Sequence, residues 1–198
     1  MIVIDIETTG TNPFKHSILS LGAVDFRAPE VQFYEECRIW DGAKVEEEAL
    51  AANGTKVEDL TDKSKQTEES LVKNFLTWLE ERDDMRIAGQ SVFFDRSFIE
   101  SASARAGIPS KLSYRVIDLH SITFAHMIRR GIEPPVLNRK TNLNSDKIME
   151  YVGIPAEPRP HIGLNGALWE AEAFSRLLYD KPLLTQFEKY PVPWISAQ

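Results

Sequence analysis

Two acidic side chains near the N-terminus are the residues whose type and spacing most directly suggest chemistry. Asp5 and Glu7 follow the apolar run Ile2–Ile4 and are two positions apart, so in a strand they project to the same side of a sheet. Carboxylates on one face repel each other unless a positive group lies between them, and Mg²⁺ and Mn²⁺ prefer oxygen ligands. The pair indicates a divalent metal site, although an Asp-x-Glu pair at a strand end is often just solvated.

Three other segments carry residues that could complete such a site. Thr8-Thr9-Gly10 follows directly and offers hydroxyls and a backbone that can approach a ligand closely. Asp95 lies at a predicted strand-to-helix junction, where aspartate also commonly caps a helix. His161 lies in a loop before the last predicted helix; beside an activated water its imidazole could accept a proton, whereas most loop histidines are surface residues.

The elements that must position these residues follow from the hydrophobic pattern. It predicts strands over 2–5, 18–26, 31–40, 86–89 and 114–118, the second and third forming an antiparallel hairpin, and helices over 67–82, 95–106, from 119 to about 131, 141–152 and 165–179. Thr67 and Asp118 are expected N-caps. The order indicates an α/β fold with a mixed sheet of about five strands flanked by helices. We expect one domain over 1–180 and an irregular tail over 181–198, packed on it or extending from it.

The three segments together resemble a known family. Asp5-Ile-Glu-Thr-Thr-Gly10, Val92-Phe-Phe-Asp95 and His161 ahead of a helix are similar to the motifs of the DEDD exonuclease superfamily, in its histidine-containing subgroup. The resemblance implies a ribonuclease H-like fold and two-metal hydrolysis at the 3′ end of single-stranded DNA or RNA, with two Mg²⁺ or Mn²⁺ ions. It implies that Asp5, Glu7 and Asp95 serve the metals and that His161 is the general base. A polymerase or another protein is an expected partner.

One family position is different in this chain. Five residues after His161, where the family has its fourth carboxylate, stands Gly166. The protein could have lost activity and kept binding, the glycine could be an engineered change, or another residue could supply the oxygen. Glu170 lies one helical turn beyond and is the expected replacement, because helical side chains lean towards the N-terminus. The alternative is that Glu170 is a solvated helix charge, and Glu172 should point away.

Contacts to the nucleic acid are expected around the same segments. The predicted contacts are Thr8, Thr9, Gly10, Phe14, Ser91 and Phe94. Phe14 could stack on the terminal base, since aromatic side chains hold single strands without sequence preference, or it could pack in the core.

Charge and cysteine content bear on the partner and the location of the protein. The net charge is −7, but residues 1–104 carry −10 and residues 105–160 carry +4, so the latter could contact phosphates or could be scattered solvated charges. One cysteine, Cys37, excludes an intrachain disulfide, and with no signal or membrane segment we expect a cytoplasmic protein. Besides an active exonuclease, a nuclease-like module that binds without turnover and a phosphoesterase of small nucleotides stay open.

Overall fold

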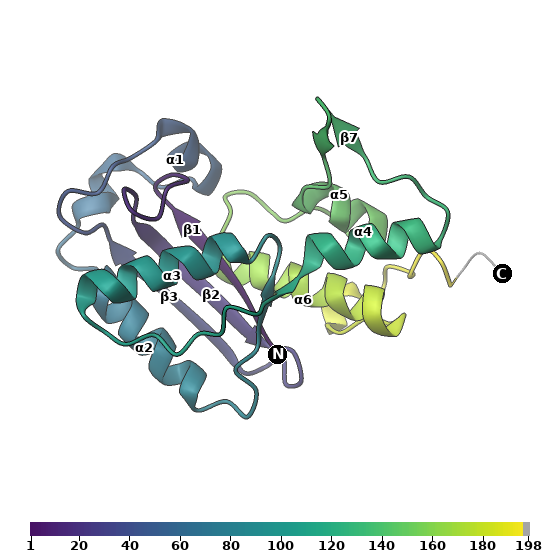
Figure 1. The fold of residues 1–198 in the computed structure, drawn as a ribbon, viewed down its shortest axis with the longest axis horizontal. Helices are drawn as coiled ribbons and strands as arrows, with labels where there is room; N and C mark the ends of the chain where they lie inside the picture. The colour runs from purple at the N-terminus through teal and green to yellow at the C-terminus, as the bar shows by residue number, and fades with distance from the viewer. Residues whose placement is uncertain (196–198) are drawn as a thin grey trace.

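The computed structural model describes residues 1–195 and shows a six-stranded sheet with helices against both faces (Figure 1). The strand order is β4-β3-β2-β1-β5-β6, with β1 (Ile2–Thr8) in the interior of the sheet. β1 pairs antiparallel with β2 (Ile18–Asp25), and β2 pairs antiparallel with β3 (Gln32–Arg38). β5 (Ile87–Gly89) and β6 (Ile117–Asp118) add in parallel on the other side of β1. The expected mixed sheet and the expected hairpin are confirmed.

The sheet has one strand more than expected. β4 (Gln66–Thr67) pairs in parallel with Cys37 and Arg38 at the edge. Two polar residues carry no alternating apolar pattern, so this strand gave no signal in the sequence. β1 also continues to Thr8 instead of ending at Asp5, which places both N-terminal carboxylates inside the strand.

The helices have these bounds: α1 Glu47–Asn53, α2 Glu68–Glu80, α3 Phe93–Ala106, α4 Leu119–Arg129, α5 Ser145–Val152 and α6 Gly163–Tyr179. Thr67 and Asp118 cap α2 and α4 as expected, each side chain accepting from the backbone N–H three residues on. α5 begins four residues later than predicted, because Asn144 is its N-cap and Lys140–Thr141 (β8) pairs instead with Val136–Leu137 (β7). Short 3-10 turns occupy Val57–Thr61 and Thr185–Phe187.

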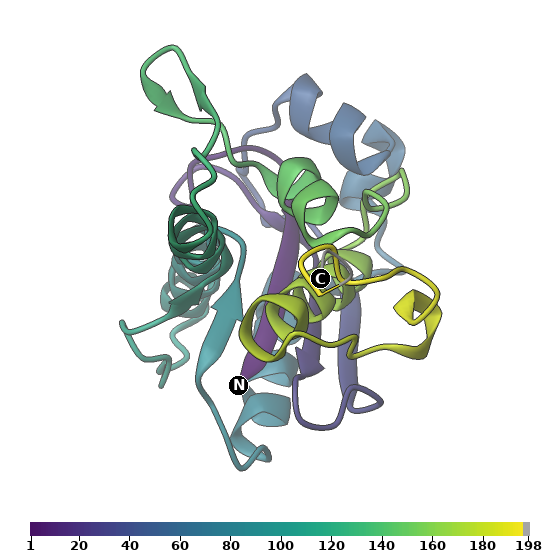
Figure 2. The same ribbon diagram turned by 90° about the vertical axis from the view of Figure 1, so that its right-hand side faces the viewer.

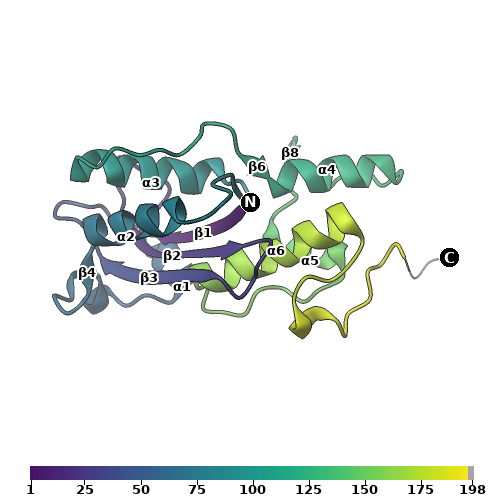
Figure 3. The ribbon, with the colours of Figure 1, turned by 90° about the horizontal axis from the view of Figure 1, so that it is seen from below.

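Side chains of β1 point alternately to the two faces of the sheet, and each face carries its own hydrophobic cluster. Ile2, Ile4 and Ile6 belong to a cluster with buried residues of α2 and α3. These two helices lie on one side of the strands (Figure 3). Val3 belongs to a second cluster, with buried residues of α4, α5 and α6. Because Asp5 and Glu7 share the side of Val3, the two acidic residues face α6, not α2 and α3.

The start of α6 lies directly on the strand backbones. A Cβ atom on Gly22 would come within 2.2 Å of the backbone of Gly163 and Leu164, and one on Gly163 would come within 2.8 Å of the Asp5 carbonyl oxygen. Only glycine at both positions permits this approach. The first turns of α6 are therefore held against β1 and β2 at the level of Asp5.

The segment after α6 packs back onto the domain. Arg176 is fully buried, forms an ion pair with Glu172 (2.7 Å), and donates to the carbonyls of Phe187 and Tyr190. Glu172 in turn accepts from the N–H groups of Leu183 and Leu184. Residues 181–195 thus lie against the domain and include the 3-10 turn Thr185–Phe187, and residues 196–198 lie outside the described part of the chain.

Candidate active site

The Asp5 carboxylate lies against the backbone of α6 at Gly166. A Cβ atom at position 166 would come 2.1 Å from Asp5 Oδ2, closer than real atoms approach. The glycine therefore makes room for Asp5. The residue that replaces the family carboxylate is therefore also the residue that allows the Asp5 carboxylate to lie where it does.

Glu170 lies one turn further along α6 and is buried. Its side chain is 4% exposed, and its Oε2 accepts from the backbone N–H of Gln90 at 3.0 Å, just after β5. Glu170 is therefore not a solvated helix charge. Glu172, as expected, points away, into its ion pair with Arg176.

Asp95 reaches β1 from the first turn of α3. Because β5 pairs with β1 only at Ile2 and Val3, the edge of β1 beyond them is open, and the Ile6 N–H donates to Asp95 Oδ1 at 3.1 Å. The side chain is 4% exposed. The helix begins at Phe93, so Asp95 is not its N-cap.

Burial raises the pKa of all four carboxylates, and neighbouring negative charges add to the effect. Burial raises the pKa of Asp5 well above its usual range, and the charges of Glu170, Asp95 and Glu7 raise it further. Burial also raises the pKa of Asp95 and of Glu170, and the charge of Asp95 adds to the effect on Glu170. Burial, then the charge of Glu157, raises the pKa of Glu7 to about 7. Among residues 1–195, none of the four carboxylates has an ion-pair partner.

His161 lies just before α6 and shares a cleft with Glu7. The cleft has a volume of about 230 Å³, and Ser20, Tyr34 and Asn53 also line it. His161 Nδ1 lies 3.9 Å from Glu157 Oε2, while Glu157 Oε1 accepts from the Ile162 N–H at 3.3 Å. Sequence reasoning missed Glu157, because the Pro-rich loop that carries it has neither periodicity nor a motif.

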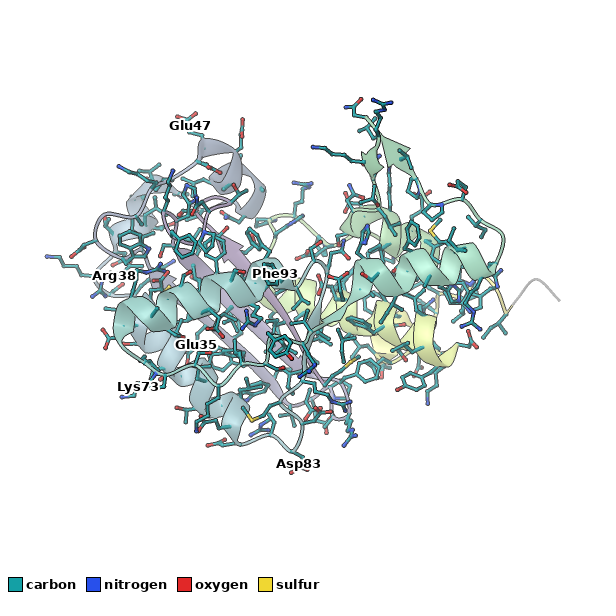
Figure 4. All side chains as sticks on the ribbon, viewed as in Figure 1. Glu35, Arg38, Glu47, Lys73, Asp83 and Phe93 are labelled. Atoms are coloured by element: carbon teal, nitrogen blue, oxygen red, sulfur yellow. The ribbon has the colours of Figure 1, made fainter. Side chains whose placement is uncertain are left out.

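An open, mostly apolar groove of about 1020 Å³ lies between the loop after β1 and the face of α3. We call it the aromatic groove; Phe14, Ser91, Phe93, Phe94, Arg96 and Asp118 are among its lining residues. Phe14 is 79% exposed, so the alternative that it packs in the core is wrong. Phe94 packs partly against Phe98, with ring centroids 4.9 Å apart. Phe93, at the start of α3 (Figure 4), is 64% exposed and was not predicted.

The hydroxyls of the Thr8-Thr9-Gly10 segment make hydrogen bonds within the fold. The Thr9 hydroxyl is fully buried and donates to the carbonyl of Lys44 at 2.7 Å, and the Thr8 hydroxyl donates to that of Gly10 at 2.8 Å. A Cβ on Gly10 would come within 2.7 Å of the His16 ring. Both threonine hydroxyls therefore already donate within the protein, and contact of the three residues with nucleic acid stays a prediction.

The sequence comparison decides the family. The model of the RNase_T family, described as exonuclease, matches residues 2–165, which is most of the chain. The chain belongs to this exonuclease family. No curated protein sequence matches it significantly.

Solved structures share the exonuclease fold at low identity. Cell-death related nuclease 4 superposes with a TM-score of 0.71 at 18% identity, over 96% of this chain and 65% of that one. The nuclease domain of 3′hExo, a DEDDh family member, gives 0.69 at 17%, over 92% and 93%. E. coli exonuclease I gives 0.67 at 15%, over 88% and 40%, so this exonuclease spans less than half of that chain. The expected ribonuclease H-like fold is confirmed, and the family model confirms that the chain is an exonuclease-family domain.

The donor chemistry suits divalent cations, but the side chains do not converge. Buried carboxylates without a basic partner are the oxygen donors that Mg²⁺ and Mn²⁺ prefer. Within residues 1–195, however, no three His, Cys, Asp or Glu side chains are arranged to hold one ion together. Asp95 and Glu170 each direct an oxygen at a backbone N–H instead. Binding of metal by this set would need these side chains to turn.

Within residues 1–195, no helix combines the length and apolar character required to cross a membrane.

Proposed function

We propose that this exonuclease hydrolyses phosphodiesters at the 3′ end of single-stranded DNA or RNA, using two divalent cations, Mg²⁺ or Mn²⁺. The observation that carries the proposal is the pair of carboxylates on either side of one turn of α6: Asp5 lies against Gly166, and Glu170 follows one turn later, with its charge raising the pKa of Asp5. A glycine that admits one carboxylate, with a second buried carboxylate one turn beyond it, supports a working acidic centre more than a lost one.

Asp5, Glu7, Asp95 and Glu170 would hold the two ions, with Glu170 in the role that the family gives to the carboxylate absent at position 166. When bound, such ions stabilise the attacking and leaving oxygens of a phosphoryl transfer. The raised pKa values of Asp5 and Glu170 support this role, because a bound cation would offset both the burial and the mutual repulsion that raise them.

His161 would accept a proton from the attacking water. It lines the same cleft as Glu7 and is partly exposed, so water can reach it. The water oxygen would bond to phosphorus, and the bond from phosphorus to the 3′ oxygen of the preceding nucleotide would break. The products would be a mononucleotide and a strand with a new 3′ hydroxyl.

The aromatic groove would receive bases near the 3′ end. Phe14 and Phe93 are exposed aromatic rings on two segments that also flank Asp95 and β1. Two structures with the same fold are described with nucleic acid: exonuclease I in complex with a dT13 oligonucleotide, and a 3′-exonuclease with 3′-end specific recognition of a histone mRNA stem-loop. These support a nucleic-acid strand as the substrate. A polymerase partner and a cytoplasmic location stay predictions from the sequence.

A binding module without turnover is the second candidate. The replacement of the family carboxylate by Gly166 and the lack of three converging ligands favour it. A strand labelled at its 5′ end, incubated with Mn²⁺, separates the two: progressively shortened labelled products support the exonuclease, and retention of an intact strand supports the module. A phosphoesterase of small nucleotides would cleave a dinucleotide and leave the long strand intact.

A further inference from the structure

The hairpin β7–β8 projects from the body of the protein beyond α4 and α5 (Figures 1 and 2). All six residues from Val136 to Thr141 are exposed. Asn138 and Arg139 join the strands with φ of 49° and 64°, the left-handed conformation that a tight two-residue hairpin turn requires. The projection is therefore a defined element and not a loose loop.

The tip of this hairpin is basic. Arg139 and Lys140 are exposed, and neither forms an ion pair within residues 1–195. Beside them Val136 is 64% exposed and Leu137 57% exposed. Two free cations next to apolar side chains match a nucleic-acid strand, whose phosphates are anionic and whose bases and sugars are partly apolar.

The base of the hairpin is joined to the carboxylate centre. The chain leaves β8 at Thr141, and the carbonyl of Leu143, two residues on, accepts from the Gln90 side chain at 3.3 Å. The backbone N–H of the same Gln90 donates to Glu170. Thr141 is also held to α4 through His120, with Oγ1 and Nε2 2.8 Å apart. Leu143, two residues after the hairpin, is thus linked to the proposed metal ligand Glu170 through one residue, Gln90.

We propose that β7–β8 is a basic arm that contacts phosphates of the substrate strand several nucleotides from the 3′ end. The inference rests on the proposed function. From Leu143 to the turn is about five residues, or roughly 15 Å of extended chain. At the 3.4 Å per phosphate of a stacked strand, that reach corresponds to about four nucleotides. The partner is a nucleic acid and not a protein, because the free charge is positive on a protein whose net charge is −7.

The test uses a double variant, Arg139→Gln with Lys140→Gln, in the full chain. Binding is measured in EDTA, which prevents cleavage, on fluorescent DNA strands of about three and about twelve nucleotides. We expect weaker binding of the long strand and unchanged binding of the short one. Removing two phosphate contacts makes the fall of log binding constant with log salt concentration less steep by about 1.4. The ratio of the binding constant of the unmodified protein to that of the variant should therefore fall about sevenfold between 50 and 200 mM salt.

The matched control is Lys63→Gln with Lys73→Gln, which removes two exposed positive charges, one in the loop before β4 and one on α2. Lys73 lies far from the hairpin (Figure 4). This control should bind both strands like the unmodified protein. Equal affinity and equal salt slope in the arm variant overturn the proposal, and the hairpin would then be a protein-binding surface. If the unmodified protein shortens the long strand in Mn²⁺ while the arm variant binds normally, only the arm inference fails. If the unmodified protein neither binds nor shortens it, the proposed function fails as well.

Discussion

The carboxylate of Asp5 occupies the space that a side chain at position 166 would need, since a Cβ there would lie 2.1 Å from Asp5 Oδ2. The nearest atoms all belong to the Asp5 side chain and none to the backbone, so a larger residue at position 166 would push the Asp5 carboxylate away. The glycine that departs from the family pattern is thus part of how this chain places its first carboxylate.

Gly166→Ala should lower the nuclease activity while the protein stays folded. The added methyl group displaces the Asp5 carboxylate, and a displacement of about 1 Å in such a centre can reduce a rate about a hundredfold. The rate is measured in Mn²⁺ alongside the urea unfolding midpoint. Gly166→Asp should behave similarly; a gain in activity from Gly166→Asp would instead show that the natural centre is degenerate.

Glu170→Gln should lower metal affinity and activity by about a hundredfold or more, because it removes a proposed ligand. The same change should raise the free energy of unfolding in EDTA at pH 7, since it removes a buried charge that faces Asp95 and Asp5. Calorimetric titration with Mn²⁺ and urea unfolding are the measurements. Unaltered Mn²⁺ affinity would rule out Glu170 as a ligand.

Glu157→Gln is the matched comparison for that variant. Glu157 touches the backbone of Ile162 and lies near His161, so its loss should disturb the histidine and lower kcat about tenfold, with Mn²⁺ affinity retained. A fall in Mn²⁺ affinity as large as that of Glu170→Gln would make Glu157 the substitute ligand instead.

The stability of the metal-free protein should fall as the pH rises from about 4.5 to about 7. Burial raises the pKa of Glu7 from 4.5 to about 7, so between these values the folded state holds a proton that the unfolded state releases. Linkage then gives a loss of about 3 kcal/mol from Glu7 across this window, and the raised pKa values of Asp5, Asp95 and Glu170 add losses in the same direction. Urea unfolding in EDTA at several pH values checks this, and Glu7→Gln should flatten the dependence. A stability that rises over the same window would contradict the raised pKa.

Phe14→Ala and Phe93→Ala should each weaken binding of a single strand by about 1–3 kcal/mol, the usual contribution of one stacked base. Tyr179→Ala is the control, because that ring is 57% exposed but lines a cavity with Met1 and Arg86, residues that do not line the aromatic groove. Equal losses in all three variants, measured by fluorescence anisotropy, would show that the groove has no special role.

Arg176→Ala should destabilise the domain by about 3–5 kcal/mol, because it leaves Glu172 charged and buried without its partner. It also removes the donors to the Phe187 and Tyr190 carbonyls, so the tail should become sensitive to protease before the rest of the chain. Tail cleavage no faster than in the unmodified protein would mean that other contacts hold the tail.

Much of the fold and part of the site were predictable, because alternation and helical periodicity are strong signals. Asp5 and Glu7 share a face as their spacing requires, and α2 has the predicted cap. Contacts between distant segments left no comparable signal. The two-residue strand β4 depends on pairing with β3, and Glu157 reaches the site only because its loop folds back beside His161. The hydrogen bond from the Thr9 hydroxyl to the carbonyl of Lys44, 35 residues away, left no signal in the sequence either.

A DNA strand labelled at its 5′ end gives the most direct test of the central claim. With Mn²⁺ the unmodified protein should convert it into a ladder of labelled products that shorten step by step from the 3′ end, and neither EDTA samples nor Asp5→Asn should form the ladder. Release of the label as a mononucleotide at the first time point, or an intact strand after long incubation with Mn²⁺, would contradict a metal-dependent 3′→5′ exonuclease.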